Sequence, residues 1–156
     1  MTVATEAQLL RDLLEQVAQI EEVAETLPVD DQRRRKLESV AEKQLASAAP
    51  VRPVVASELL QLTEKTVRAW ADEGVLVVRQ KRPRVLLEAK RLHYVLHLLT
   101  DLRRAGKTRG LLDEVYRQLS DQALLDREDL AVSLDQMRRH EGRIVRPRPR
   151  DTKRDS

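Results

Sequence analysis

The spacing of apolar residues near the N-terminus limits the fold more than any other feature of this chain. Six of them recur at alternating intervals of three and four residues: Leu10, Leu13, Val17, Ile20, Ala24 and Leu27. This spacing places them along one side of an α-helix. It predicts an amphipathic helix over residues 5–27 that ends before Pro28, because proline cannot continue the hydrogen-bond ladder.

A second helix is expected to follow, capped by Asp30 or Asp31 and running to about Ala48. Its predicted inward residues are Leu37, Val40, Ala41, Leu45 and Ala48. Residues 1–49 are therefore predicted to form a helical hairpin. Two roles are open for it: packing within one chain, or forming the interface of a homodimer through a coiled-coil seam. The second role is favoured because about 45 residues bury little of such a stripe alone.

The composition also favours helices. Aromatic residues make up 2% of the 156 residues (Trp70, Tyr94 and Tyr116), so the core must consist of Leu, Val, Ile and Ala. The chain has no cysteine, which excludes disulfides and cysteine-ligated metal sites. No apolar run approaches the roughly 20 residues of a membrane span, and no secretory leader pattern is present. A mainly α, cytoplasmic protein with no membrane partner is expected.

The C-terminal part is predicted to be helical over residues 93–142, with its first helix starting near Glu88. The apolar stripe of that helix comprises Leu92, Val95, Leu96, Leu99 and Leu102. Gly106 is expected to cap its C-terminal end. Further helices are predicted over residues 110–119 and 126–140. The segment 143–156 alternates arginine and proline and is predicted to be a disordered basic tail.

Charge is distributed unevenly along the chain. The net charge is −4 over residues 1–50, +7 over residues 51–110 and zero over residues 111–156. The basic excess in the middle predicts a polyanionic partner for that segment. Two prolines, Pro50 and Pro53, indicate a linker before it. We therefore expect a separate binding module over residues 50–92.

Local signals within this module predict two short helices and a hairpin. Ser57 can cap the first helix, with Leu59, Leu60 and Leu62 on its inner face, and Thr63 can cap the second. Val67 and Trp70 share one face of the second helix, and Gly74 can end it. Apolar runs over 75–78 and 85–87 flank a basic turn that contains Pro83. This order predicts a helix-turn-helix with a two-stranded wing.

The stretch "VVASELLQLTEKTVRAWADEGVLVVRQKRPRVLLEAKRL", residues 54–92, resembles the winged helix-turn-helix of the MerR and excisionase group. The shared pattern is a short helix, a Ser/Thr turn, "TVRAW", and "EGVL" leading into the wing. Gln61 stands where these proteins often carry glycine. The resemblance implies duplex DNA as the partner, with the second helix in the major groove. The expected DNA-binding residues are Thr63, Glu64, Lys65, Thr66 and Arg68 on that helix, and Arg79, Lys81, Arg82 and Arg84 on the wing.

We interpret the chain as a sequence-specific transcriptional regulator that binds double-stranded DNA, as a dimer. One alternative is an antitoxin that regulates its own operon and neutralises a toxin through residues 111–150. Another is an excisionase-type recombination directionality factor.

No enzyme is expected, because the chain has no nucleophile elbow and no phosphate loop. His93 and His97 are spaced i, i+4 but lack the glutamate of a zinc-protease helix, so they are expected to pack at the edge of their stripe or to pair with Asp101. No cofactor or metal is predicted.

Overall fold

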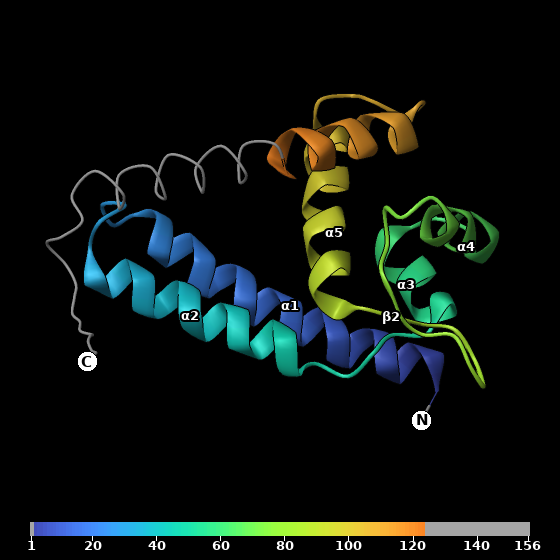
Figure 1. Ribbon diagram of the computed structural model, residues 1–156, viewed down its shortest axis with the longest axis horizontal. Helices are drawn as coiled ribbons and strands as arrows, with labels where there is room; N and C mark the ends of the chain where they lie inside the picture. The colour runs from blue at the N-terminus through green and yellow to red at the C-terminus, as the bar shows by residue number, and fades with distance from the viewer. Residues whose placement is uncertain (1, 124–156) are drawn as a thin grey trace, which may run out of the picture. The chain divides into compact units, whose positions relative to one another are not determined.

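The computed structural model describes residues 2–123, of which residues up to 115 belong to one compact unit and the rest to a second. The fold is mainly helical, as predicted, with one small antiparallel sheet (Figure 1). The elements are α1 (Val3–Glu25), α2 (Gln32–Ser47), α3 (Pro53–Leu60), α4 (Glu64–Asp72), β1 (Val78–Gln80), β2 (Leu86–Leu87) and α5 (Ala89–Arg104). A further helical stretch covers 111–123.

The predicted helix over 126–140 and the predicted tail over 143–156 lie outside the described residues. Within residues 2–123, no helix combines the length and the apolar character needed to cross a membrane. The predicted module boundaries at 49/50 and 92/93 stay predictions. Helices on either side of both boundaries pack against one another in the first unit.

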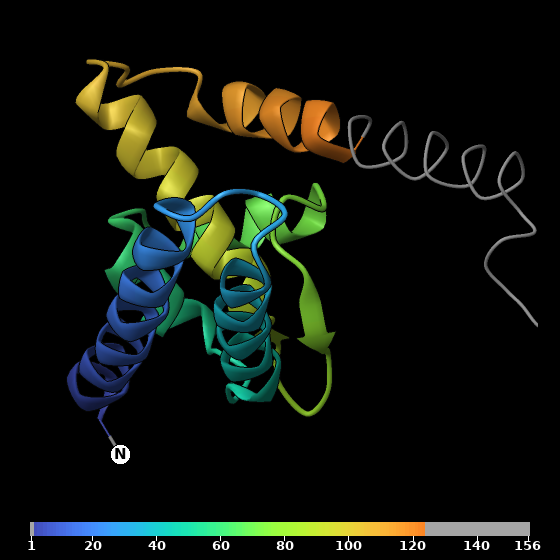
Figure 2. The ribbon, with the colours of Figure 1, turned by 90° about the vertical axis from the view of Figure 1, so that its left-hand side faces the viewer.

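Helices α1 and α2 lie side by side as a hairpin (Figures 1 and 2). Each begins with a side-chain cap: the Thr2 hydroxyl accepts the Thr5 N–H at 3.1 Å, and the Asp31 carboxylate accepts the Arg33 N–H at 2.8 Å. Such caps satisfy backbone donors that have no partner inside the helix. Three residues of the predicted α1 stripe are buried, namely Leu10, Val17 and Ala24, whereas Leu13, Ile20 and Leu27 are half-buried. Ala7 and Leu14 complete the buried face, which α2, α3 and neighbouring segments cover.

One inward assignment in α2 is wrong. Ala41 and Leu45 are buried, whereas 46% of the Val40 surface is exposed. Consecutive residues lie about 100° apart around a helix. A face centred on Ala41 and Leu45 therefore turns Val40 toward solvent.

Helix α3 begins earlier than predicted. Pro53 occupies its first turn, and Ser57 lies inside the helix, where its hydroxyl donates to the Val54 carbonyl at 2.7 Å. Proline is favoured at the first helical position because its φ is preset and its missing N–H would have no helical partner. The proline that indicated a linker is thus a helix start.

A left-handed residue joins α3 to α4. Gln61 has φ 54° and ψ 47°, and the Leu62 N–H then donates back to the Ser57 carbonyl at 3.2 Å. This is the backbone conformation that glycine adopts most readily. The turn therefore keeps the geometry of a glycine turn although glutamine stands there.

The sheet starts later than the sequence indicates. Val75 and Leu76 are buried, but their N–H groups donate to the Trp70 carbonyl rather than to a strand. β1 pairs with β2 across an irregular register, Val78 with Leu87 and Gln80 with Leu86. Val51 adds a bridge to Leu87 from the other side, with N–H···O distances of 2.8 and 2.7 Å.

Helix α5 packs on α2 and α3 and carries much of the core. Four residues of its predicted stripe are buried, namely Leu92, Val95, Leu99 and Leu102, and the fifth, Leu96, is half-buried. Gly106 has φ 85°, and the N–H of the following residue, Lys107, donates to the Leu102 carbonyl at 3.0 Å. The predicted glycine cap is confirmed.

Candidate nucleic-acid interface

Two buried side chains fix the orientation of α4. Val67 and Trp70 have 0% and 4% of their surface exposed, and both face the core. Gly74 follows the helix with φ 83°, in the conformation that lets the chain turn back. With Val67 and Trp70 inside, the opposite side of α4, which carries Lys65 and Arg68, faces solvent.

The first turn of α4 holds two threonines in a cap. The Thr63 hydroxyl accepts the Thr66 N–H at 3.1 Å, and the two hydroxyl oxygens lie 2.8 Å apart. The cap was predicted; the bond between the hydroxyls was not. Lys65 in the same turn is exposed, and within residues 2–123 it forms no ion pair.

Arg68 is paired on its own helix. Its Nη2 and Nε lie 2.9 and 3.1 Å from Oε2 of Glu64, one turn away. Both side chains are about half exposed, 52% and 43%. An exposed pair of this kind contributes little net free energy in water. Arg68 can therefore exchange Glu64 for another anion at small cost.

The basic turn, residues 79–84, presents four cations to solvent: Arg79, Lys81, Arg82 and Arg84. Within the described chain, none of the four forms an ion pair. The Gln80 side-chain amide donates to the Arg84 carbonyl at 3.3 Å and spans the turn. The turn is thus held by backbone and amide contacts, and its charges are left available.

Helix and turn meet at one hollow. Arg68 from α4 and Lys81 and Arg82 from the basic turn line an open depression of about 530 Å³. Its other walls are Ala71, Asp72, Val78, Pro83 and Val85. The structure therefore brings three of the nine predicted residues to one concave surface. Arg79 and Arg84 lie outside it.

Arg84, at the end of the basic turn, acts electrostatically on Glu6 of α1. Arg52, which precedes α3, donates from Nε to Oε1 of Glu6 at 3.1 Å. This hydrogen bond lowers the pKa of Glu6, and the charge of Arg84 adds a smaller effect in the same direction. The Arg52–Glu6 pair links α1 to the start of α3, on the side where the basic turn ends.

Two supporting arginines were missed in the sequence. Arg91 on α5 donates to the carbonyls of Gly74 and Val75 at 3.3 and 3.2 Å. Arg103, also on α5, lies 3.4 Å from the Gln61 carbonyl. Arg103 therefore binds the backbone just before α4, and Arg91 binds it just after α4. Their positions in the basic segment 51–110 gave no signal that separated them from DNA-binding cations.

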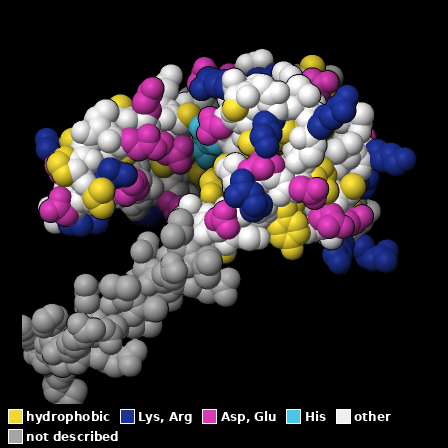
Figure 3. All heavy atoms as spheres, turned by 90° about the horizontal axis from the view of Figure 1, so that it is seen from above, with side chains coloured by type: hydrophobic (Ala, Val, Ile, Leu, Met, Phe, Trp, Pro, Cys, Tyr) yellow, Lys and Arg dark blue, Asp and Glu magenta, His cyan; other side chains and the backbone are white. Residues whose placement is uncertain are grey.

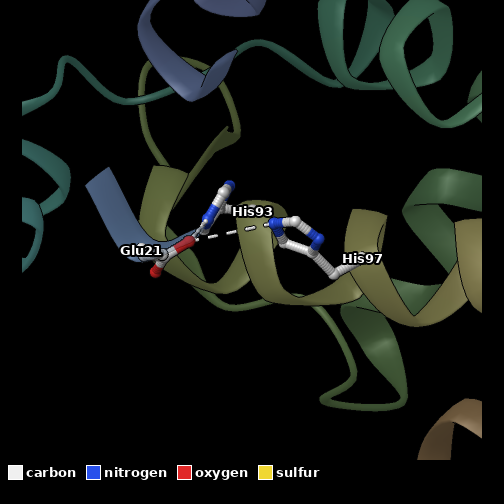
Figure 4. Close-up of side chains that lie close together, drawn as sticks. All are labelled: Glu21, His93 and His97. Atoms are coloured by element: carbon white, nitrogen blue, oxygen red, sulfur yellow. Dashed lines mark hydrogen bonds and ion pairs between the residues drawn. The ribbon is translucent and has the colours of Figure 1, made fainter. Parts of the chain in front are cut away.

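A second group of polar side chains lies away from this surface, between α1 and α5. Figure 3 shows the histidines in a recess bordered by acidic side chains, and Figure 4 shows them with Glu21. His93 is buried and bonds to Glu21 rather than to Asp101, with 2.9 Å between Nε2 and Oε1. Burial, and then the neighbouring His93, lower the pKa of His97.

Comparison with known proteins gives no match to a family model, a curated protein or a solved structure.

Proposed function

We propose that residues 53–87, from α3 to β2, bind duplex DNA, with α4 in the major groove and the basic turn on the adjacent backbone. In this proposal the segment is a winged helix-turn-helix of the MerR and excisionase type, and the protein is a transcriptional regulator. One observation carries it: a solvent-facing helix and an unpaired cationic turn border the same hollow.

Dimensions and charge support this assignment. Nine residues give α4 a length of about 13 Å, and a helix with side chains fits a major groove about 12 Å wide. Six cations face solvent on the two elements: Lys65, Arg68, Arg79, Lys81, Arg82 and Arg84. If each neutralises one phosphate, the binding constant should fall with salt at a log–log slope of about −5.

The test measures DNA affinity against salt by fluorescence anisotropy, using the full chain and labelled duplex fragments. Lys81→Ala combined with Arg82→Ala removes two phosphate contacts and should flatten the slope by about two. The matched control is Lys36→Ala combined with Lys43→Ala on α2, which removes the same charge from another exposed surface. The control should keep the original slope. Equal loss in both variants would show that only overall charge matters and would refute the interface.

Dimerisation remains a proposal. Helices α2 and α3 pack on α1 within one chain and bury Leu10, Val17 and Ala24, which leaves less apolar surface of α1 for a partner protomer. Light scattering of the purified chain, alone and with DNA, decides between a preformed dimer and two protomers that meet on the duplex. For the antitoxin interpretation, residues 124–150 of the proposed toxin-binding segment lie outside the described residues, and no contact of residues 111–123 favours it. Within residues 2–123, no contact favours the recombination factor either.

A further inference from the structure

The side chains of Glu21, His93 and His97, here called the histidine cluster, converge from two helices far apart in the sequence (Figure 4). One oxygen of Glu21 lies 2.9 Å from Nε2 of His93 and 3.9 Å from Nε2 of His97. The i, i+4 spacing puts both imidazoles on one side of α5, with ring centroids 4.4 Å apart. All three potential ligand atoms lie within 4.8 Å of one another.

Hydrogen bonds do not account for the position of every side chain in the histidine cluster. The separation of 3.9 Å is too long for a hydrogen bond, so His97 is held beside the carboxylate without bonding to it. His93 is buried, and its Nδ1 has no partner among the described residues. One carboxylate oxygen thus lies beside two imidazoles and hydrogen-bonds to only one of them.

The distances suit a small cation. Around tetrahedral Zn²⁺, ligand atoms at about 2.0–2.1 Å from the metal lie about 3.3 Å from one another. The two separations from the Glu21 oxygen, 2.9 and 3.9 Å, lie on either side of that value, and all three ligand atoms lie within 4.8 Å of one another. Equalising the first two takes shifts of a few tenths of an ångström, and closing the remaining one takes at most about 1.5 Å. The His97 side chain is half-exposed, so it can make most of this movement.

The surroundings add access and negative charge. The cluster borders a hollow of about 600 Å³ between α1, α2 and α5. Three further carboxylates line this hollow: Glu25, Glu38 and Glu42. Glu38 and Glu42 form ion pairs with Arg34 and Lys90, so the net negative charge of the hollow comes from Glu21 and Glu25. A hydrated cation can therefore enter from solvent toward a negatively charged wall and keep a water ligand.

We propose that Glu21, His93 and His97 bind a Zn²⁺ ion, with water in the fourth position. Two imidazole nitrogens and one carboxylate suit zinc and its transition-metal neighbours, and do not suit Mg²⁺ or Ca²⁺. The site is independent of the proposed DNA-binding surface. Its ligands lie 72 residues apart on α1 and α5, so the ion joins the hairpin to the helix that anchors α4. It therefore stabilises the folded chain in proportion to the logarithm of free metal.

Binding at His93 moves a proton within the ring. The neutral imidazole that donates from Nε2 to Glu21 must carry its hydrogen on Nδ1 once Nε2 binds the metal. That N–H finds no acceptor among the described residues. We therefore expect an affinity about 10–100-fold weaker than in a site whose ligating histidine donates its other N–H to an acceptor.

The experiment uses the full chain without an affinity tag. Isothermal titration with Zn²⁺ should give one ion per chain, and thermal melting should shift upward with zinc and return after a chelator is added. His97→Ala should abolish both effects while leaving the metal-free melting temperature nearly unchanged, because that side chain is 51% exposed. Co²⁺ in place of Zn²⁺ should give the visible bands of a four-coordinate ion.

The third histidine of the chain supplies the matched control. His140→Ala removes an imidazole of the part of the chain that the structure does not describe, and it should leave zinc uptake and the melting shift intact. Glu21→Gln should weaken uptake and keep the hydrogen bond to His93. Absence of uptake, or uptake that survives His97→Ala, would overturn the site. A loss with His140→Ala equal to that with His97→Ala would also overturn it.

Discussion

Replacing Gln61 by glycine should stabilise the first unit by about 0.8 kcal/mol, the difference between the central values of the two terms below. The residue has φ 54°, a left-handed conformation that costs a non-glycine residue about 1–2 kcal/mol because its Cβ crowds the following carbonyl. Glycine removes that cost, but it also raises the conformational entropy of the unfolded chain. This entropy lowers the stability of the fold by about 0.4–1 kcal/mol. The exposed glutamine side chain contributes no buried packing that would be lost. The contact from Arg103 reaches the backbone carbonyl and is kept.

The expected change is measurable by thermal melting. An unfolding entropy of about 2.1 cal/mol/K per residue gives about 0.24 kcal/mol/K for 115 residues. The gain therefore raises the melting temperature by about 2–4 °C. Gln61→Ala is the control, because alanine keeps the Cβ and should leave the melting temperature unchanged. A glycine variant no more stable than the alanine variant would refute the reasoning from backbone strain.

Four further outcomes are expected. Trp70→Ala should cost about 3–5 kcal/mol in urea unfolding followed by circular dichroism, since the ring is 4% exposed; a smaller loss would mean that the site collapses around the cavity. Glu64→Gln should strengthen binding to every duplex in anisotropy, because it releases Arg68 and removes a negative charge; unchanged affinity would place α4 away from DNA. Arg68→Ala should cost about 1–3 kcal/mol and relax base preference in a binding-site selection, if the guanidinium contacts a base; uniform weakening would assign it to phosphate. The Arg33 side chain and N–H lower the pKa of Asp31 from 3.8 to about 2. The stability this adds is therefore complete above about pH 4 and is lost as the pH falls toward 2. Melting-temperature differences between the wild type and Asp31→Asn should accordingly shrink between pH 4 and pH 2, and a constant difference would contradict this cause.

Features with a local cause could be predicted from the sequence. The cap at Thr63 depends on Thr66, three residues away, and the left-handed positions of Gly74 and Gly106 depend on the helices they end. Residue spacing identified most of the buried face of α5 and, for α1, Leu10, Val17 and Ala24. In each case the signal lies within one or two helical turns of the residue, so a single chain contains enough information.

Features that depend on tertiary packing could not be predicted from the sequence. Pro53 has the same sequence signal as a linker and as a helix start, and only the packing of α3 decides between them. The strand predicted from Val75 begins at Val78, because the first two N–H groups return to the Trp70 carbonyl. Glu21 and His93 are 72 residues apart, and no spacing rule connects residues on different helices.

The bridge between Val51 and Leu87 has a practical consequence. A shortened chain that starts at Pro53 would lose both backbone hydrogen bonds and uncover Leu87, which is 1% exposed. A fragment intended to retain the basic turn must therefore begin upstream of Val51. In the whole protein, the same two bonds connect the end of the hairpin to the base of the turn. A tilt of α1 and α2 would therefore move β1 and β2, and with them the exposed cations of the basic turn.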